Sequence, residues 1–423
     1  MELGPILRAI RRNKARFGLI AVEVALTLAV VVNCIALIAD ARAQMARPSG
    51  FPDDDLLTVS SAPFDAAFKE PGYQQAALRA DLDALAALPG VAVVTSTRLI
   101  PWSGGGSSGE YRQAGAGDAA PMLRSQIYNA DERTLDALGV RLVAGRTFTR
   151  EEVDRDTRRL QEITIHPREL GSDGRPVDKF LQDVVVTRAW AEHVFGPGPH
   201  LGRLFQDSDG DQYRVLGVFD PFYNPYGWPI HEYAVFYARR SSSYENGTRY
   251  LVQAEPGQAS ALARTIEETL TRVNRLRAVE VSRVTEIRYL YFGRQRMVAG
   301  LMGLVAVLLV VVTGLGLVGL TSFLVSERTR QIGTRRALGA SMVDIVRYFL
   351  VENWLLMSIG IAMGVGLAVA LNLALVSSIA SARLDPITVA AAAAALWLLG
   401  LASALVPALR AARTSPAVAT RSV

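Results

Sequence analysis

The sequence predicts a membrane protein with two parts: an α-helical domain of four membrane spans, and a large α+β external domain between spans one and two. The 423 residues have a mean hydropathy of +0.21, and their apolar residues are concentrated in four long runs, one near the N-terminus and three after residue 297. Between the first and second runs the composition is that of an ordinary globular protein. This pattern excludes a disordered chain, a collagen and a simple soluble enzyme.

Each of the four runs is long enough to cross a bilayer. A helix rises about 1.5 Å per residue, so roughly 20 apolar residues span the hydrocarbon core. The runs that meet this requirement are residues 17–39, 298–325, 345–380 and 387–409. The first run has a signal peptide as its alternative interpretation, because Ala41-Arg42-Ala43 resembles a cleavage site. Signal peptides have apolar cores of about 7–15 residues, which favours an uncleaved anchor here.

The basic residues predict the orientation of the spans. The net charge of +5 divides into −3 for residues 40–297 and +8 for the remainder, so the positive charge flanks the apolar runs and does not indicate a nucleic-acid surface. Basic loops lie in the cytoplasm. Residues 1–16, the connection between spans two and three, and the tail 410–423 are all basic, whereas the last connection carries only Arg383. Both termini are therefore expected in the cytoplasm and residues 40–297 outside.

Two features near the first span bear on its environment. In residues 1–16, apolar side chains recur at helical spacing opposite arginines, which predicts a short helix lying in the cytoplasmic interface. Glu23 is the one charged residue in the first run and lies about two turns inside it. The favoured interpretation is that Glu23 extends toward the headgroups, and the alternative is a contact with another span.

Residues 40–290 are predicted to form the external domain. A strand–helix–strand order occurs twice, in residues 51–99 and again in 248–285, from alternating and helical spacing of apolar residues. The insertion between them, residues 100–247, is predicted to contain more strand than helix. Residues 150–180 are rich in charged and turn-forming residues, so we expect a mobile loop there.

No pattern in the sequence indicates a catalytic or metal site. None of the three lysines follows a glycine, which excludes a phosphate-binding P-loop in this chain. Gly314–Gly319 matches a dinucleotide fingerprint but lies within a span, where glycines allow close helix packing, as do Gly360 and Gly364. Residues 207–211 lack the spacing of a calcium loop and predict a hairpin turn. The four histidines lack metal-ligand spacing, and Cys34 has no disulfide partner in the chain.

The connection between spans two and three, residues 326–344, carries the functional prediction. An apolar stripe is expected from Ile332, Leu338, Val343 and Ile345–Val346, with Glu327 and arginines on the remaining surface. The pattern predicts a stiff amphipathic helix at the cytoplasmic face, which can transmit force when another protein binds it. A solvated positively charged loop is the alternative interpretation.

The same segment resembles the coupling segment of MacB/FtsX-type ABC transporter permeases, whose pattern is close to E-R-x-x-E-I-G-x-R-R-A-L-G-A. Gln331 stands where that family usually has Glu, which changes one charge contact with the ATPase. Similar segments occur in the external domain, including residues 88–91, 142–148 and 186–191, and in the tail. The ATPase-coupling residues that the resemblance implies are Glu327, Arg328, Arg330, Gln331, Ile332, Gly333, Arg335, Arg336, Ala337, Leu338, Gly339 and Ala340.

The resemblance implies a permease subunit, itself not an enzyme, that couples ATP hydrolysis by a separate cytoplasmic ATPase to periplasmic conformational change, for export. ATP and Mg²⁺ would be bound by that ATPase, and this chain would hold no cofactor. The permease would form a dimer with a second copy or a paralogue in the inner membrane, and a membrane-fusion protein is a further partner to be tested. The halves 51–99 and 248–285 resemble porter subdomains, the insertion 100–247 resembles the Sabre subdomain, and residues 291–325 resemble a stalk continuing into span two.

Two other functions remain as alternatives. One is an FtsX-like relay that controls an external enzyme or sensor without transporting cargo. The other is a plain anchored binding domain, which leaves the pattern of residues 326–340 without a role.

Overall fold

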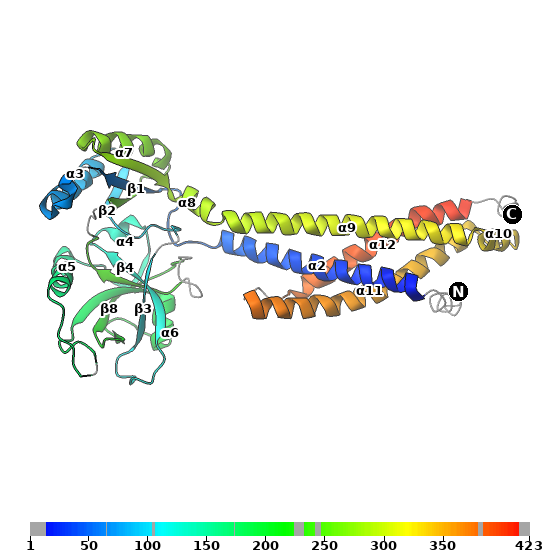
Figure 1. The fold of residues 1–423 in the computed structure, drawn as a ribbon, viewed down its shortest axis with the longest axis horizontal. Coiled ribbons are helices and arrows are strands. Elements are labelled where there is room, and N and C mark those ends of the chain that lie inside the picture. Colours follow the sequence, from blue (N-terminus) through cyan, green and yellow to red (C-terminus); the bar gives the residue numbers. More distant parts are fainter. Residues whose placement is uncertain are drawn as a thin grey trace. The chain divides into compact units, whose positions relative to one another are not determined.

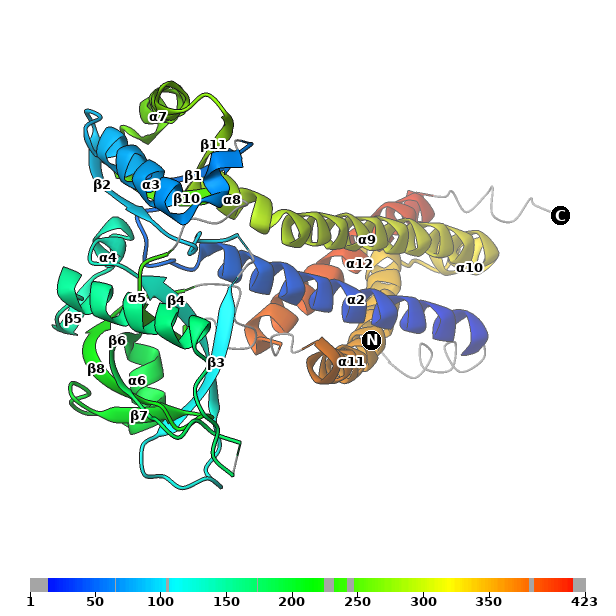
Figure 2. The ribbon, with the colours of Figure 1, turned by 60° about the vertical axis from the view of Figure 1, so that its left-hand side comes forward.

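The protein is described here from a computed structural model, which describes residues 14–64, 66–103, 106–172, 174–223, 232–241, 247–379 and 384–413. The chain divides into two compact units (Figures 1 and 2). The helical unit comprises the residues up to Ala46 and from Arg294 onward, and the sheet unit comprises Arg47–Gly293. The predicted interfacial helix lies outside the described residues except at its end, as do the tail beyond Arg413 and the first half of the last connection, residues 381–383.

The described part of the helical unit contains four long helices and a short one. All four long helices are apolar and long enough to cross a membrane, as the sequence predicts. They extend past the predicted runs because helix-forming residues flank those runs; the first continues from Ala39 to Ala46 through alanine, arginine and glutamine. The helices are α2 (Lys14–Ala46), α9 (Gly293–Glu327), α10 (Thr329–Ala337), α11 (Met342–Ile379) and α12 (Pro386–Arg413).

Glycines let α2 and α11 approach closely, as predicted for the Gly360–Gly364 pair. A Cβ atom placed on Gly360 would lie 2.9 Å from Val24, and one on Gly364 would lie 3.0 Å from Leu28. Both contacts are shorter than ordinary van der Waals contact, so a larger residue at either position would push the helices apart.

Substitution of Gly364 by Leu is therefore expected to destabilise the helical unit, since overpacking a well-packed interface typically costs about 1–3 kcal/mol. The matched control is Gly366→Leu on the same helix, because a Cβ at Gly366 meets no atom within 4 Å. Thermal unfolding of the full chain in detergent should show a lower Tm for G364L and a wild-type Tm for G366L. Equal Tm values for the two variants would contradict this packing.

Polar side chains also join the helices of this unit. Thr27 Oγ1 of α2 lies 2.7 Å from Thr313 Oγ1 of α9, and Asn353 Nδ2 of α11 donates to the Gly400 carbonyl of α12 at 2.6 Å. All four residues are in membrane-length helices, where a polar group needs a partner within the protein.

Glu23 lies against another helix, which corrects the favoured prediction. Its Oε1 atom would be 2.8 Å from a Cβ placed on Gly316 of α9. The side chain thus lies against α9, which is the interhelical contact that the sequence left as the alternative. The physical reason is that Gly316 has no side chain, so α9 leaves room there for the carboxyl group.

The sheet unit contains a four-stranded sheet, here called the split sheet. Its order is β11-β1-β10-β2, with every neighbouring pair antiparallel. The two predicted strand–helix–strand segments therefore interleave in one sheet, as in a split βαβ arrangement. Helices α3 and α7 pack on the sheet through residues such as Leu85 and Ile266, which are fully buried. The elements are β1 (Leu56–Pro63), α3 (Pro71–Ala86), β2 (Val91–Ser96), β10 (Thr248–Ala254), α7 (Ala259–Val273) and β11 (Arg277–Arg283).

A buried ion pair crosses this layer. Arg277 Nη2 donates to Asp81 Oδ1 at 2.8 Å, and the two side chains are only 1% and 3% exposed. The Tyr250 hydroxyl also donates to Asp81, and Arg277 Nε donates to the Leu270 carbonyl at 3.1 Å. The pair therefore connects α3, α7, β10 and β11.

The insertion forms a second sheet, here called the insertion sheet. Its order is β5-β8-β6-β9-β4-β3-β7, and β7 also pairs with β8, so the sheet closes on itself. Aromatic rings fill its interior. The ring centres of Trp190 of α6 and Phe205 are 4.5 Å apart, and Phe205 stacks on Tyr213 with 5.3 Å between the ring centres. The elements are β3 (Ser107–Gln113), β4 (Leu123–Ala130), β5 (Leu142–Gly145), β6 (Leu181–Thr187), α6 (Arg188–Phe195), β7 (Leu204–Asp207), β8 (Gln212–Phe219) and β9 (Ala234–Ala238).

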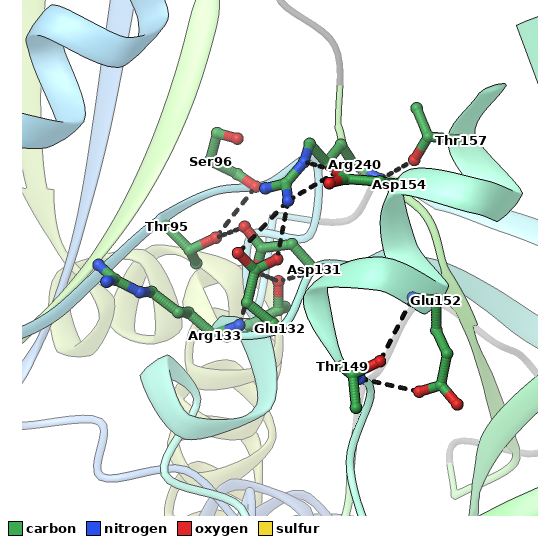
Figure 3. A network of polar contacts seen from close by, with 11 residues as sticks. Thr95, Ser96, Asp131, Glu132, Arg133, Thr149, Glu152, Asp154, Thr157 and Arg240 are labelled. Carbon is green, nitrogen blue, oxygen red and sulfur yellow. Dashed lines mark hydrogen bonds and ion pairs between the residues drawn. The ribbon is translucent and has the colours of Figure 1, made fainter.

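Residues 207–211 form the turn of the β7–β8 hairpin, which confirms the predicted hairpin. The prediction of a mobile loop at 150–180 is wrong for its first half, because helix α5 occupies Arg150–Ile165. Thr149 and Glu152 form a capping box: Glu152 N donates to Thr149 Oγ1 at 3.3 Å, and Thr149 N donates to Glu152 Oε2 at 2.8 Å (Figure 3). Charge-rich composition concealed this helix, although the Thr-x-x-Glu signature marks its start.

The α5 cap is expected to weaken in acid. The hydrogen bonds from the Arg146 guanidinium lower the pKa of Glu152 to about 2, against about 4.3 for an ordinary Glu. A lowered folded-state pKa means that the stabilisation is present above pH ~4.3 and is lost as the pH falls through about 2. Hydrogen exchange of α5 should lose protection over that range in the wild type. At pH 7, α5 should already be less protected from exchange in E152Q than in the wild type. E162Q, at the other end of α5, should be protected like the wild type. Equal protection in the wild type, E152Q and E162Q would contradict the cap.

Candidate functional site

The predicted coupling segment is a helix–turn–helix, not a single stiff helix. Helix α9 ends at Glu327, α10 occupies Thr329–Ala337, and α11 begins at Met342. The break follows from Gly339, whose φ of +96° lies in the left-handed region that favours glycine. The next helix then starts with its own cap, because Asp344 N donates to Ser341 Oγ at 3.2 Å and Ser341 N donates to Asp344 Oδ2 at 3.1 Å.

A buried ion pair holds the junction of α9 and α10 against α11. Arg328 Nη1 donates to Glu352 Oε2 at 2.9 Å and to Oε1 at 3.1 Å. The side chains are 15% and 3% exposed, respectively. An ion pair removed from water needs good geometry to be retained, so this contact positions the segment against α11.

An apolar cluster anchors one face of α10. Ile332 packs with Ile345 and Phe349 of α11 and with Ala408 and Ala412 of α12. The predicted apolar stripe is therefore correct for Ile332, Ile345 and Val346 and wrong for Leu338 and Val343. Those two side chains are 84% and 72% exposed, because the chain turns after α10 and carries them away from the cluster.

The opposite face of the segment is open. Gln331 and Thr334 are exposed and lie three residues apart on α10, so they share one side of the helix, and Leu338, in the turn after the helix, is exposed as well. Glu327 and Gly339 are exposed as well. Ala340 is half-buried, and the side chains of the remaining predicted residues Arg330, Arg335, Arg336 and Ala337 lie outside the described structure.

The structure thus separates the predicted coupling residues into two groups. Arg328, Ile332 and Gly333 face the bundle, and Gln331, Leu338 and Gly339 face outward. Sequence reasoning missed Glu352 and Phe349, which hold the inner group. Glu352 had a signal that could have found it, since a lone carboxylate near the start of an apolar run requires a cationic partner.

Within the sheet unit, Arg240 joins three elements (Figure 3). Arg240 Nη2 lies 3.1 Å from Glu132 Oε2, in the loop after β4, and 3.0 Å from Asp154 Oδ1 on α5. Its backbone N–H donates to Thr157 Oγ1 of α5 at 2.9 Å. The same loop also reaches the split sheet, where Thr95 Oγ1 of β2 donates at 2.6 Å to the carboxylate of the residue before Glu132. The two sheets are therefore connected through polar contacts that include α5.

Within the described residues, no group of three or more His, Cys, Asp or Glu side chains could hold a metal ion. The described contacts of the coupling segment and of the Arg240 network are ion pairs, hydrogen bonds and apolar packing.

Two family models match the chain. The FtsX-like permease C-terminal model matches residues 303–416, and the MacB-like periplasmic core domain model matches residues 18–269, which is more than half of the chain. The chain belongs to the MacB/FtsX-like permease family. The resemblance inferred from the coupling segment and the external domain is therefore confirmed. The fold class is confirmed too, with four span-length helices and a large sheet-rich domain between the first two.

Relatives within this family include fused proteins. A macrolide export ATP-binding/permease protein, MacB 1/2 of Paracoccus denitrificans, is 27% identical over 97% of this chain and 57% of its own length. A MacB of Chromobacterium violaceum is 25% identical over 66% of this chain and 40% of its own length. The chain thus spans about half the length of these curated relatives. The periplasmic region of MacB from Actinobacillus actinomycetemcomitans aligns with a TM-score of 0.33 and 14% identity, over 57% of this chain and 93% of that structure.

Proposed function

We propose that this chain is the permease subunit of an ABC transporter whose coupling segment binds a cytoplasmic ABC ATPase. ATP-driven movement of that ATPase is transmitted through the helical unit to the periplasmic sheet unit, and this movement drives export. The ATPase lies outside these 423 residues, which contain no Gly-Lys pair and hence no P-loop. ATP and Mg²⁺ are bound by that ATPase.

One observation carries this proposal: α10 is fixed on one face and exposed on the other. The Arg328–Glu352 pair and the cluster around Ile332 attach it to α11 and α12. A force applied to the exposed face is therefore passed to two membrane-length helices. Leu338 is 84% exposed, and burial of its side chain against a partner would remove apolar surface from water.

The proposed location is the inner membrane, with both termini in the cytoplasm and residues 40–297 in the periplasm. The basic segments at residues 1–16, between α9 and α11, and at 410–423 support this orientation, because arginine-rich loops stay in the cytoplasm. The coupling segment then lies on the side where ATP is available.

Export and a regulatory relay make different predictions about what stimulates the ATPase. The relatives named for macrolide export support export as the first candidate. In a reconstituted complex, stimulation of ATP hydrolysis by a transported small molecule supports export. Stimulation only by an added periplasmic protein supports the relay, and a membrane-fusion protein is one such proposed partner.

Attachment to the ATPase is tested by replacing the exposed leucine of the segment. Affinity-tagged chain is purified from its native membranes, and the co-purified ABC ATPase is measured by mass spectrometry and ATP hydrolysis. Leu338→Asp should lower the recovered ATPase at least tenfold. Leu170→Asp, which alters an exposed leucine of the sheet unit, should leave it unchanged. Recovery of equal ATPase with both variants would overturn the proposed coupling surface.

We also propose that two permease copies, or this chain and a paralogue, meet along α9. Only 11% of the most apolar 18-residue stretch of α9 is buried within the chain, against 61% of the corresponding stretch of α2. Most of α9 is therefore open to lipid or to another helix. With Cys34 changed to Ser, Leu308→Cys should form a cross-linked dimer in the membrane, because Leu308 is exposed. Leu317→Cys, buried within the chain, is the control and should not cross-link. Cross-linking from neither site in native membranes would contradict a dimer along α9.

A further inference from the structure

The insertion sheet and α5 line a partly open cavity of mixed polar and apolar character that the proposed coupling does not use. Its volume is about 200 Å³, and its lining includes Asp156, Arg159, Phe180, Gln182, Tyr213 and Arg239. Pockets for drug-sized ligands span roughly 300–1,000 Å³. The size of this cavity therefore suits a compact polar molecule and not a bulky cargo.

Three buried polar atoms of this lining have no hydrogen-bond partner. They are Asp156 Oδ2, Gln182 Nε2 and Arg239 Nε. Asp156 and Gln182 are only 5% and 3% exposed. Buried polar atoms in native proteins are nearly always paired, so three unpaired atoms around one cavity indicate a missing partner inside it.

The rest of each group is already held in place. Asp156 Oδ1 accepts from Arg155 Nε at 3.0 Å. Gln182 Oε1 accepts from Arg239 Nη2 at 3.0 Å, which defines the amide orientation and leaves Nε2 as the unpaired donor. The guanidinium of Arg239 also lies 4.6 Å from the ring centre of Tyr237. The unpaired set therefore consists of one carboxylate acceptor and two donors in fixed positions.

The other buried or half-buried charged groups around the cavity are paired, and Arg159 and Asp209 are exposed at its rim. Arg168 binds both carboxylate oxygens of Asp211, each at 2.8 Å. Asp207 accepts from the Tyr213 hydroxyl at 2.8 Å and from backbone N–H groups of its own hairpin turn. Arg159 lies over the Phe180 ring at 4.5 Å. Among the buried groups of this lining, the three unpaired atoms are therefore the ones left to bind a ligand.

This arrangement selects for a ligand that carries both charges. A simple anion would satisfy Gln182 and Arg239 but face the Asp156 carboxylate, and a simple cation would satisfy Asp156 but leave both donors unpaired. We propose that the cavity binds a small zwitterion of the α-amino-acid class. Its carboxylate accepts from Gln182 Nε2 and Arg239 Nε, and its ammonium group donates to Asp156 Oδ2.

The position of the cavity gives ligand binding a route to the rest of the sheet unit. Asp156 lies on α5 between Asp154 and Thr157, which Arg240 holds (Figure 3). Arg239 and Arg240 are consecutive residues after β9, one facing the cavity and the other the network that reaches the split sheet. A ligand that binds Asp156 and Arg239 therefore contacts residues beside both parts of that network, α5 and the segment after β9.

The test uses the full chain in detergent micelles, with binding of each of the twenty L-amino acids measured by calorimetry after a thermal-shift screen. At least one is expected to bind. For that amino acid, the N-acetyl derivative and the carboxamide should each bind at least tenfold more weakly, because each lacks one of the two charges. If none of the twenty amino acids binds, water alone fills the cavity and the proposal is overturned. Binding of either derivative as tightly as the amino acid itself would also overturn it.

Variants provide a second arm. Asp156→Asn and Gln182→Leu should each weaken binding at least tenfold, whereas Asp209→Asn, an exposed residue at the rim of the same cavity, should not. Unchanged binding in D156N and Q182L would also overturn the proposal. The derivative experiment needs no substitution, so it decides the matter even where a variant unfolds. Binding to the isolated permease does not depend on the ATPase, so this result is independent of the proposed coupling.

Discussion

Replacement of Glu352 by Gln should destabilise the helical unit and uncouple it from the ATPase. The substitution leaves the buried Arg328 guanidinium without its counter-charge, and loss of one partner of a buried pair typically costs about 3–5 kcal/mol. Because Arg328 connects the end of α9 to α10, the exposed face of the segment should lose its fixed position. The expected results are a lower Tm of the full chain in detergent and at least a tenfold loss of ATP-driven function.

The double variant R328M/E352M distinguishes the cost of an unpaired buried charge from the loss of the contact between the segment and α11. Two apolar side chains of similar length leave no unpaired charge, and such replacements are often neutral for stability. The Tm should therefore recover most of the loss seen in E352Q. As a control, Glu327→Gln changes an exposed carboxylate and should alter the Tm little. A wild-type Tm for E352Q would show that the pair does not hold the junction.

Replacement of Asp81 by Asn should give the largest loss of stability in the sheet unit. Arg277 would keep its charge in a site where both side chains are at most 3% exposed, at an expected cost of about 3–5 kcal/mol. For a domain of this size that corresponds to a fall in Tm of about 10 °C. Differential scanning calorimetry of the full chain in detergent resolves the change.

Asp83 provides the matched control for this pair. It lies two residues further along α3 and is exposed, so Asp83→Asn should melt like the wild type. The combination D81L/R277M should recover part of the lost stability, because it removes both charges. Identical melting of D81N and D83N would show that the Asp81–Arg277 contact contributes nothing measurable.

The features that depend on local pattern could be predicted from the sequence. Four runs of about 20 or more apolar residues indicated the spans, and alternating apolar residues indicated the strands of both strand–helix–strand segments. The glycine pair on α11 also packs as expected, because Gly360 and Gly364 are one helical turn apart and share a face. These signals act within one element or between neighbours.

The features that depend on distant pairing could not be predicted. The interleaving of β1 between β10 and β11 joins segments 187 to 226 residues apart, and no local pattern encodes that register. The partner of Arg328 lies 24 residues further on, in α11, and the break at Gly339 depends on a left-handed backbone conformation. Helix α5 was missed because its many charges resemble a loop, although the Thr149–Glu152 signature was present. The cavity beside α5 could not be predicted either, because its existence depends on this missed helix.

The central claim is that the coupling segment transmits ATPase movement to the sheet unit. Its most direct test is double electron–electron resonance on the ATPase-bound complex, with Cys34 changed to Ser and a spin label at Val273→Cys, an exposed position at the end of α7. We predict that a nonhydrolysable ATP analogue shifts the distance between labels on the two permease copies. The shift should be absent in E352Q complexes that still contain the ATPase. An unchanged distance in the wild type, or the same shift in E352Q, would contradict this account.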